Sequence, residues 1–181
     1  MFVAVDIPEP VRTRLAETTS RLRDSVPGAR WVPPGNWHVT MKFLGSVYPR
    51  LRQWVGERVA DAARAAEPFE TRLTVMGAFP SSWRARVLWT GLDDSEGRLV
   101  RLAAELDRLL EREFRMEQRP FSAHLTVARF REQVNLDEEM LGLEVASKPF
   151  RVEALTLYRS HLQRPAARYE PLSRFALSRN A

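Results

Sequence analysis

The segments His38–Met41 (HVTM) and His124–Val127 (HLTV) share one pattern, in which a histidine is followed two residues later by a threonine and apolar residues fill the other positions. Side chains two residues apart on a β-strand point to the same face. Each segment therefore predicts a strand that presents a histidine and a threonine together and packs its apolar residues behind them. The longer stretch 37–44 continues the alternation, which predicts Phe43 on the apolar face and Lys42 on the polar face.

The two segments occupy equivalent points of an internal repeat. The local sequence matches as well: Pro68-Phe69 is followed by Leu73-Thr74-Val75, and Pro149-Phe150 is followed by Leu155-Thr156-Leu157. Hydrophobic periodicity predicts the same series of elements in each half, with an additional strand at the front. The expected strands are residues 2–7, 37–44, 69–79, 86–92, 121–130, 150–158 and 169–177, and the expected helices are 10–28, 50–66, 95–114 and 136–141. We infer a duplicated chain whose two lobes, about 1–92 and 93–181, each supply one histidine strand to a shared centre.

The composition excludes several classes of protein. The 181-residue chain contains no cysteine, which rules out disulfide scaffolds, thiol catalysis and cysteine-based zinc sites. No apolar run approaches the roughly 20 residues that a membrane span needs. The segment Met1–Asp6 has neither the basic region nor the cleavage site of a signal peptide. We therefore expect a cytoplasmic protein without a membrane segment.

The charge of the chain permits an anionic partner but does not identify one. The net charge is +5, and all but two of the 28 basic residues are arginine. Guanidinium groups bind phosphate through paired hydrogen bonds, which suits a nucleic acid. A genome rich in G and C would produce the same arginine bias, so composition alone leaves both explanations open.

Two imidazoles and two hydroxyls around one cleft suit acid–base chemistry at a phosphorus atom. Histidine has an ordinary pKa of about 6.5, so near neutral pH one ring can be neutral while the other is protonated. The rings can then act as general base and general acid on opposite sides of the phosphorus, while Thr40 and Thr126 donate hydrogen bonds to its non-bridging oxygens. The alternative is a pair of structural histidines, each hydrogen-bonded within a sheet. No metal site is expected, because the remaining histidine, His161, is not at ligand spacing and no carboxylate motif accompanies the pair.

Four further residues are candidates for substrate binding. Arg129 lies five residues after His124, an odd offset that on a regular strand turns it to the opposite face, so we expect it to reach a phosphate only beyond the strand end. Arg86 begins a predicted strand and either lines the cleft or is a solvated edge charge. Phe121, like Trp31, either stacks on a base or belongs to the core.

The sequence resembles the two-histidine (2H) phosphoesterase superfamily, and within it the RNA 2′,3′-cyclic phosphodiesterases of the LigT or ThpR group. The matching blocks occur in order along nearly the whole chain: Arg30–Pro33 (RWVP), Asn36–Gly45 (NWHVTMKFLG), Phe79–Pro80 (FP), Arg86–Gly91 (RVLWTG), Phe121–Arg129 (FSAHLTVAR) and Leu157–Ser160 (LYRS). This combination is far more specific than the doubled histidine–threonine pattern alone.

The resemblance implies an α+β fold, in which two pseudo-symmetric lobes of mainly antiparallel sheet carry helices on the outside and enclose the active-site cleft. It implies one domain, 1–181, with possible strand exchange between the lobes. It also implies hydrolysis of an RNA-terminal 2′,3′-cyclic phosphate to a 2′-phosphomonoester, without metal or other cofactor. By this resemblance His38 donates a proton to the departing 3′ oxygen, His124 accepts a proton from the attacking water, and both threonines hold the non-bridging oxygens.

Other functions stay open at this point. Some relatives in the group join RNA ends through a 2′-5′ bond, and others act on 2′-5′-linked oligonucleotides. A chain that retained only the fold would bind RNA without turning it over. We expect the partner to be RNA or a nucleotide with a 2′,3′-cyclic phosphate end, and the protein to be a monomer.

Overall fold

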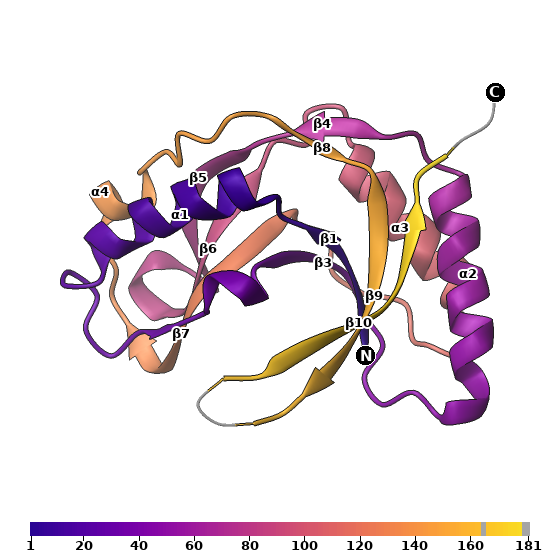
Figure 1. Ribbon diagram of the computed structural model, residues 1–181. Helices are drawn as coiled ribbons and strands as arrows, with labels where there is room; N and C mark the ends of the chain where they lie inside the picture. Colours follow the sequence, from indigo (N-terminus) through magenta and orange to yellow (C-terminus); the bar gives the residue numbers. More distant parts are fainter. Residues whose placement is uncertain (164–165, 179–181) are drawn as a thin grey trace.

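The computed structural model describes residues 1–163 and 166–178, and its elements follow the expected order except for one additional short strand, Arg30–Trp31, which was not predicted (Figure 1). The strands are β1 (Phe2–Asp6), β2 (Arg30–Trp31), β3 (His38–Phe43), β4 (Phe69–Thr71), β5 (Leu73–Phe79), β6 (Ala85–Leu92), β7 (His124–Val134), β8 (Phe150–Val152), β9 (Ala154–His161) and β10 (Arg168–Ala176). The helices are α1 (Glu9–Leu22), α2 (Arg52–Arg64), α3 (Arg98–Leu110) and α4 (Glu138–Leu141), with short 3₁₀ turns at Pro34–Asn36, Pro49–Leu51 and Ser82–Arg84.

The main sheet has the order β10-β9-β1-β3-β7-β6-β5, with β2 beside β7, and its strand pairs are antiparallel. The expected α+β class with mainly antiparallel sheet is therefore confirmed. Each end of the sheet combines strands from both halves of the chain, because β9 and β10 lie next to β1, and β5 and β6 lie next to β7. The two ends meet where β3 pairs with β7. The descent of the two lobes from one duplicated unit stays a prediction.

Two expected strands are each divided in the structure. The segment predicted as one strand over 69–79 forms β4 and then β5, and the segment predicted over 150–158 forms β8 and then continues as β9. The first three residues of each segment pair with one another, as Phe69 lies opposite Val152 and Thr71 opposite Phe150. The Pro-Phe sequence that the two halves share therefore precedes or begins the strands of a small second sheet, which joins the two halves.

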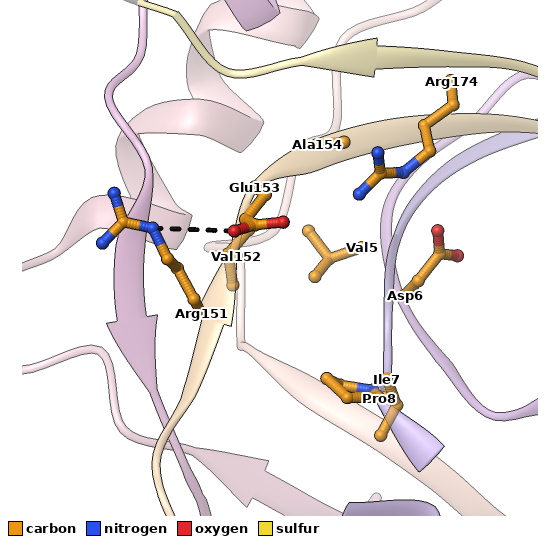
Figure 2. A pocket seen from close by; sticks show the side chains of 9 residues that line it. All are labelled: Val5, Asp6, Ile7, Pro8, Arg151, Val152, Glu153, Ala154 and Arg174. Atoms are coloured by element: carbon orange, nitrogen blue, oxygen red, sulfur yellow. Dashed lines mark ion pairs between the residues drawn. The ribbon is translucent and has the colours of Figure 1, made fainter.

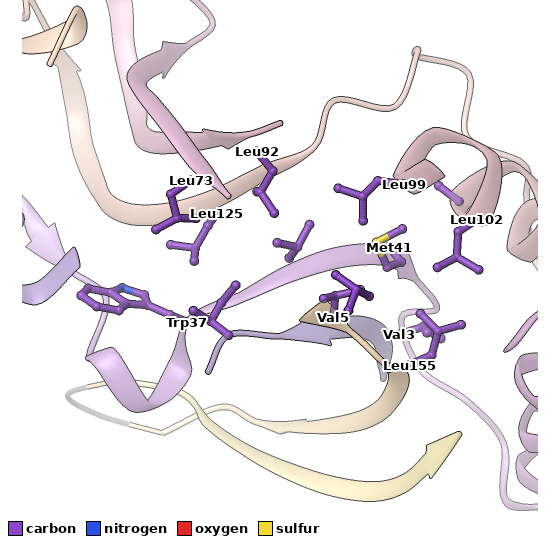
Figure 3. Packing of buried hydrophobic residues seen from close by; sticks show 14 of the residues in the cluster. Val3, Val5, Trp37, Met41, Leu73, Leu92, Leu99, Leu102, Leu125 and Leu155 are labelled. Carbon is purple, nitrogen blue, oxygen red and sulfur yellow. The ribbon is translucent and has the colours of Figure 1, made fainter. Parts of the chain in front are cut away.

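Helices α2 and α3 cover the end of the sheet that contains β3, β9 and β10, and α1 and α4 lie toward the other end (Figure 1). Leu99 and Leu102 of α3 are buried and face Met41 across the core (Figure 3). Helix α3 begins three residues later than expected, because Gly97 has a left-handed φ of 65° and the Asp94 carboxylate accepts hydrogen bonds from the first free amides, those of Leu99 and Val100. No helix within the described residues is long and apolar enough to span a membrane.

A bulge in β3 reverses the expected alternation at the end of the strand. Val3 of β1 lies opposite Lys42 and Ala4 lies opposite Thr40, so Met41 is the additional residue. Met41 and Lys42 are consequently both buried, whereas Phe43 is 70% exposed. The predicted faces of Lys42 and Phe43 were therefore wrong. The buried ammonium of Lys42 forms an ion pair with Asp107 of α3 and donates a second hydrogen bond, of 2.8 Å, to the carbonyl of Arg115.

Candidate active site

The junction between β3 and β7 places the two histidine–threonine pairs on one face of the sheet. Val39 lies opposite Leu125 in the antiparallel register, and both side chains are fully buried on the core face. The neighbouring residues on each strand must then share the other face, with His38 beside Thr126 and Thr40 beside His124. All four of these side chains are half-buried rather than enclosed. The register therefore brings together the residues that the sequence singled out.

Both histidines are held in the same tautomer by the backbone. His38 and His124 are the first residues of their strands. The Nδ1–H group of His38 donates to the carbonyl of Asn36 (2.7 Å), and the Nδ1–H group of His124 donates to the carbonyl of Ser122 (2.8 Å). A carbonyl oxygen can only accept, so Nδ1 carries the hydrogen in each ring. The backbone therefore does not engage the Nε2 atom of either ring, which can accept or donate a proton.

The ring of His38 lies in an aromatic enclosure. Phe2 stacks on it with ring centroids 4.7 Å apart, and Tyr169 meets it edge-on at 5.2 Å. Its Nε2 atom accepts a hydrogen bond of 3.0 Å from the hydroxyl of Thr40. Asp6 of β1 lies directly across the strand pair from His38. These contacts fix the plane of the ring and surround it with apolar groups on two sides.

Burial among these rings lowers the pKa of His38, and the positive charges of Arg129 and His124 lower it further. The carbonyl of Asn36 and the carboxylate of Asp6 act in the opposite direction. The neutral ring therefore predominates at neutral pH in the empty site. An anionic phosphate beside the ring would favour the protonated form again.

Asp6 is itself fixed by two hydroxyl groups. Thr156 and Tyr158 each donate a hydrogen bond of 2.7 Å, one to each carboxylate oxygen. Burial and the adjacent carboxylate raise the pKa of Tyr158 well above its usual range, so its hydroxyl remains a donor. Sequence reasoning missed Asp6, because its position beside His38 depends on the pairing of β1 with β3.

A second pair of aromatic rings supports His124. Phe79 meets the His124 ring edge-on at 5.1 Å, and Trp89 lies 6.3 Å away at a steep angle. The Trp89 indole lies directly over Gly77 of the neighbouring strand, where a Cβ atom would be 2.3 Å from the ring. The absence of a side chain at Gly77 thus leaves room for the indole that lies edge-on to His124.

Arg129 shares the histidine face, contrary to its odd offset. Trp89 lies opposite Thr126 and Leu88 opposite Ala128, so β7 carries an additional residue at this point. Val127 and Ala128 are both fully buried, and Arg129 returns to the face of Thr126. The strand also continues to Val134, so Arg129 lies within it and not beyond its end. The equivalent bulge in β3 brings the exposed Phe43 to the same face.

The other residues considered in the sequence analysis have contacts away from the two histidines. Arg86 points away from the face of Trp89 by strand alternation, and its guanidinium donates to the carbonyl of Arg131 (2.7 Å). Phe121 and Trp31 are partly buried against the core. His161 pairs with Glu170 at 2.7 Å.

Within the described part of the chain, no group of three or more His, Cys, Asp or Glu side chains could hold a metal ion. Independence from metal stays a prediction.

A separate cavity of about 200 Å³ lies at the C-terminal end of β1 (Figure 2). Figure 2 shows Arg174 on the side of Asp6, and the ion pair of Arg151 with Glu153 (3.8 Å) on the other side. The lining residues are Val5, Asp6, Ile7, Pro8, Arg151, Val152, Glu153, Ala154 and Arg174. They include neither histidine of the pair, so this cavity is not the candidate active site.

Comparison with known proteins agrees with the geometry. The LigT like phosphoesterase family matches residues 5–89 and 92–169. An RNA 2′,3′-cyclic phosphodiesterase of Methanothermobacter thermautotrophicus is 32% identical over 186 residues and is matched over 97% of both chains. A longer RNA 2′,3′-cyclic phosphodiesterase of Geobacillus stearothermophilus is 28% identical, and the match covers 97% of this chain and 56% of that relative.

Solved structures show the same fold. The crystal structure of TT0787 of Thermus thermophilus has a TM-score of 0.86 at 27% identity, covering 99% of this chain and 98% of that chain. The structure of Escherichia coli LigT complexed with 3′-AMP has a TM-score of 0.79 at 26% identity, covering 98% and 97%. With a family match over most of its length and both histidine strands in place, the chain belongs to the LigT-like phosphoesterase family.

Proposed function

We propose that this protein hydrolyses the 2′,3′-cyclic phosphate at an RNA end to a 2′-phosphomonoester. The register of β3 against β7, which gathers both histidines and both threonines on one face, is the observation that carries the proposal. The names of the relatives, RNA 2′,3′-cyclic phosphodiesterase, and the complex of LigT with 3′-AMP support the same class of substrate.

In the proposed reaction the Nε2 atom of neutral His124 accepts a proton from a water molecule, whose oxygen attacks the phosphorus. The bond between phosphorus and the 3′ oxygen breaks, and the Nε2–H group of protonated His38 donates its proton to that oxygen. The backbone contacts of both Nδ1 atoms support these roles, because they leave the Nε2 atom of each ring to exchange a proton. Each turnover leaves His124 protonated and His38 neutral, and proton exchange with solvent restores the starting state.

The threonines and two further residues complete the proposed site. The hydroxyls of Thr40 and Thr126 donate hydrogen bonds to the non-bridging oxygens, where negative charge increases in the transition state. Arg129 adds positive charge on the same face, since its guanidinium already lowers the pKa of His38. The exposed ring of Phe43 offers an aromatic surface on which an unpaired base can stack.

The test uses an oligoribonucleotide with a 2′,3′-cyclic phosphate end, incubated with the protein in the presence and absence of EDTA. We expect a 2′-phosphate product in both conditions. A 3′-phosphate product, or loss of activity with EDTA, would contradict the proposal. Replacing His38 or His124 by Ala should each lower kcat by at least about 100-fold, whereas H161Q, a change at the paired histidine of β9, should leave activity unchanged.

A further inference from the structure

Two arginines face each other beside the histidine pair. Arg30 of β2 lies directly opposite Arg129 of β7 in the antiparallel register, and both side chains are exposed. Residues that are directly opposite in such a register share a face of the sheet. Arg30 therefore lies on the face of Thr126 and the histidines, at a position that sequence reasoning did not select.

Within the described residues, neither arginine of the pair forms an ion pair with a carboxylate. Among the ion pairs formed within residues 1–163 and 166–178, none involves Arg30 or Arg129. Like charges directly opposite each other destabilise a strand pair. Many arginines elsewhere in the chain have a carboxylate nearby, such as Arg108 with Glu105 at 2.6 Å. The uncompensated arginine pair is thus available for an anion from outside.

Strand β2 holds Arg30 opposite Arg129. It is two residues long, and it pairs with β7 off the main path of the sheet. Its second residue, Trp31, lies opposite Ala128 and packs on the core, which fixes the register of Arg30 against Arg129. Two arginines at directly opposite positions suit the oxygens of a phosphodiester, because each guanidinium can donate two parallel hydrogen bonds.

We propose that Arg30 and Arg129 form a second phosphate-binding site, which takes a backbone phosphate of the RNA whose cyclic end occupies the histidine site. This inference rests on the proposed function and restricts the preferred substrate to RNA that has a backbone phosphate besides its cyclic end. A cyclic mononucleotide has no second phosphate and cannot use the site. The enzyme should therefore prefer an RNA of two or more nucleotides.

The experiment compares wild type and R30Q on adenosine 2′,3′-cyclic phosphate and on a short oligoribonucleotide with the same cyclic end. The matched control is R101Q, which removes an exposed charge from α3. For R30Q we expect kcat/KM to fall about 10-fold on the oligonucleotide and to stay unchanged on the mononucleotide. The slope of log(kcat/KM) against log salt should also decrease by about 0.7 on the oligonucleotide, as for one lost phosphate contact.

Equal losses on both substrates, or no loss on either, would overturn the proposal, as would the same loss in R101Q. Thermal unfolding of each variant shows whether the fold is intact. If wild type turns over neither substrate, the proposed function fails instead. The arginine pair is then tested by fluorescence anisotropy with an oligoribonucleotide that the protein does not cleave. The R30Q protein must bind this RNA more weakly than the R101Q protein does.

Discussion

The substitution G77A tests whether the aromatic rings beside His124 hold it in place. A Cβ atom at this position would lie 2.3 Å from two atoms of the Trp89 ring, whereas ordinary contact begins near 3.4 Å. The indole must therefore retreat by about 1 Å. Trp89 packs against Phe79 at 4.9 Å, and both rings contact His124, so the displacement reaches the imidazole.

A shift of about 1 Å in a catalytic group can lower a rate by about 100-fold. We expect G77A to lower kcat by about 10- to 100-fold with a smaller change in KM, since the lost alignment concerns His124, the proposed proton acceptor. Overpacking should also lower the free energy of unfolding by about 1–3 kcal/mol. The assay is steady-state turnover of an RNA with a 2′,3′-cyclic phosphate end, together with urea unfolding.

Two further variants make the G77A result interpretable. G56A makes the same chemical change inside α2, where the added Cβ would meet Phe175 at an ordinary 3.8 Å. It should raise stability by roughly 0.5–1 kcal/mol and leave turnover unchanged. Adding W89F to G77A should recover part of the lost activity, because the smaller ring relieves the overlap. A folded G77A protein with the kcat of wild type would refute the argument.

Three other substitutions test two parts of the site and one buried ion pair. D6N removes a negative charge that raises the pKa of His38. If His38 is the proton donor, the alkaline limb of the pH–rate profile should therefore move to lower pH. Movement of the acidic limb alone would assign His38 as the proton acceptor. T126V should lower kcat by roughly 10- to 100-fold through the loss of one donor to the phosphate, and an unchanged kcat would remove Thr126 from the mechanism. K42M leaves the carboxylate of Asp107 without its buried cation and should cost about 3 kcal/mol in urea unfolding at pH 7; a change below about 1 kcal/mol would show that the ion pair is dispensable.

Local patterns were sufficient to predict most of the elements in their order and the two strands that carry the histidine–threonine pairs. The alternation around His38 and His124 is a property of each strand alone, so it could be recognised from neighbouring residues. The doubling of the motif then indicated that the two strands meet, and the register of Val39 with Leu125 brings them together. The helical spacing of apolar residues predicted the bounds of α2 and α3 to within a few residues at each end.

The faces of Phe43, Lys42 and Arg129 could not be predicted from the same patterns. Each lies after a bulge, and a bulge is defined by how many residues one strand places opposite its partner. That count depends on strands distant in the sequence, and one additional residue moves every later side chain to the other face. Asp6 and Arg30 were missed for a related reason, since each acquires its neighbour only through strand pairing.

The most direct test of the central claim is a crystal structure of this protein with a ribonucleoside vanadate, an analogue of the transition state at phosphorus. We predict that the Nε2 atoms of His38 and His124 lie within hydrogen-bond distance, about 2.6–3.2 Å, of the two apical oxygens on opposite sides of one vanadium atom. Vanadate bound by only one of the two rings, or bound outside the junction of β3 and β7, would contradict the account.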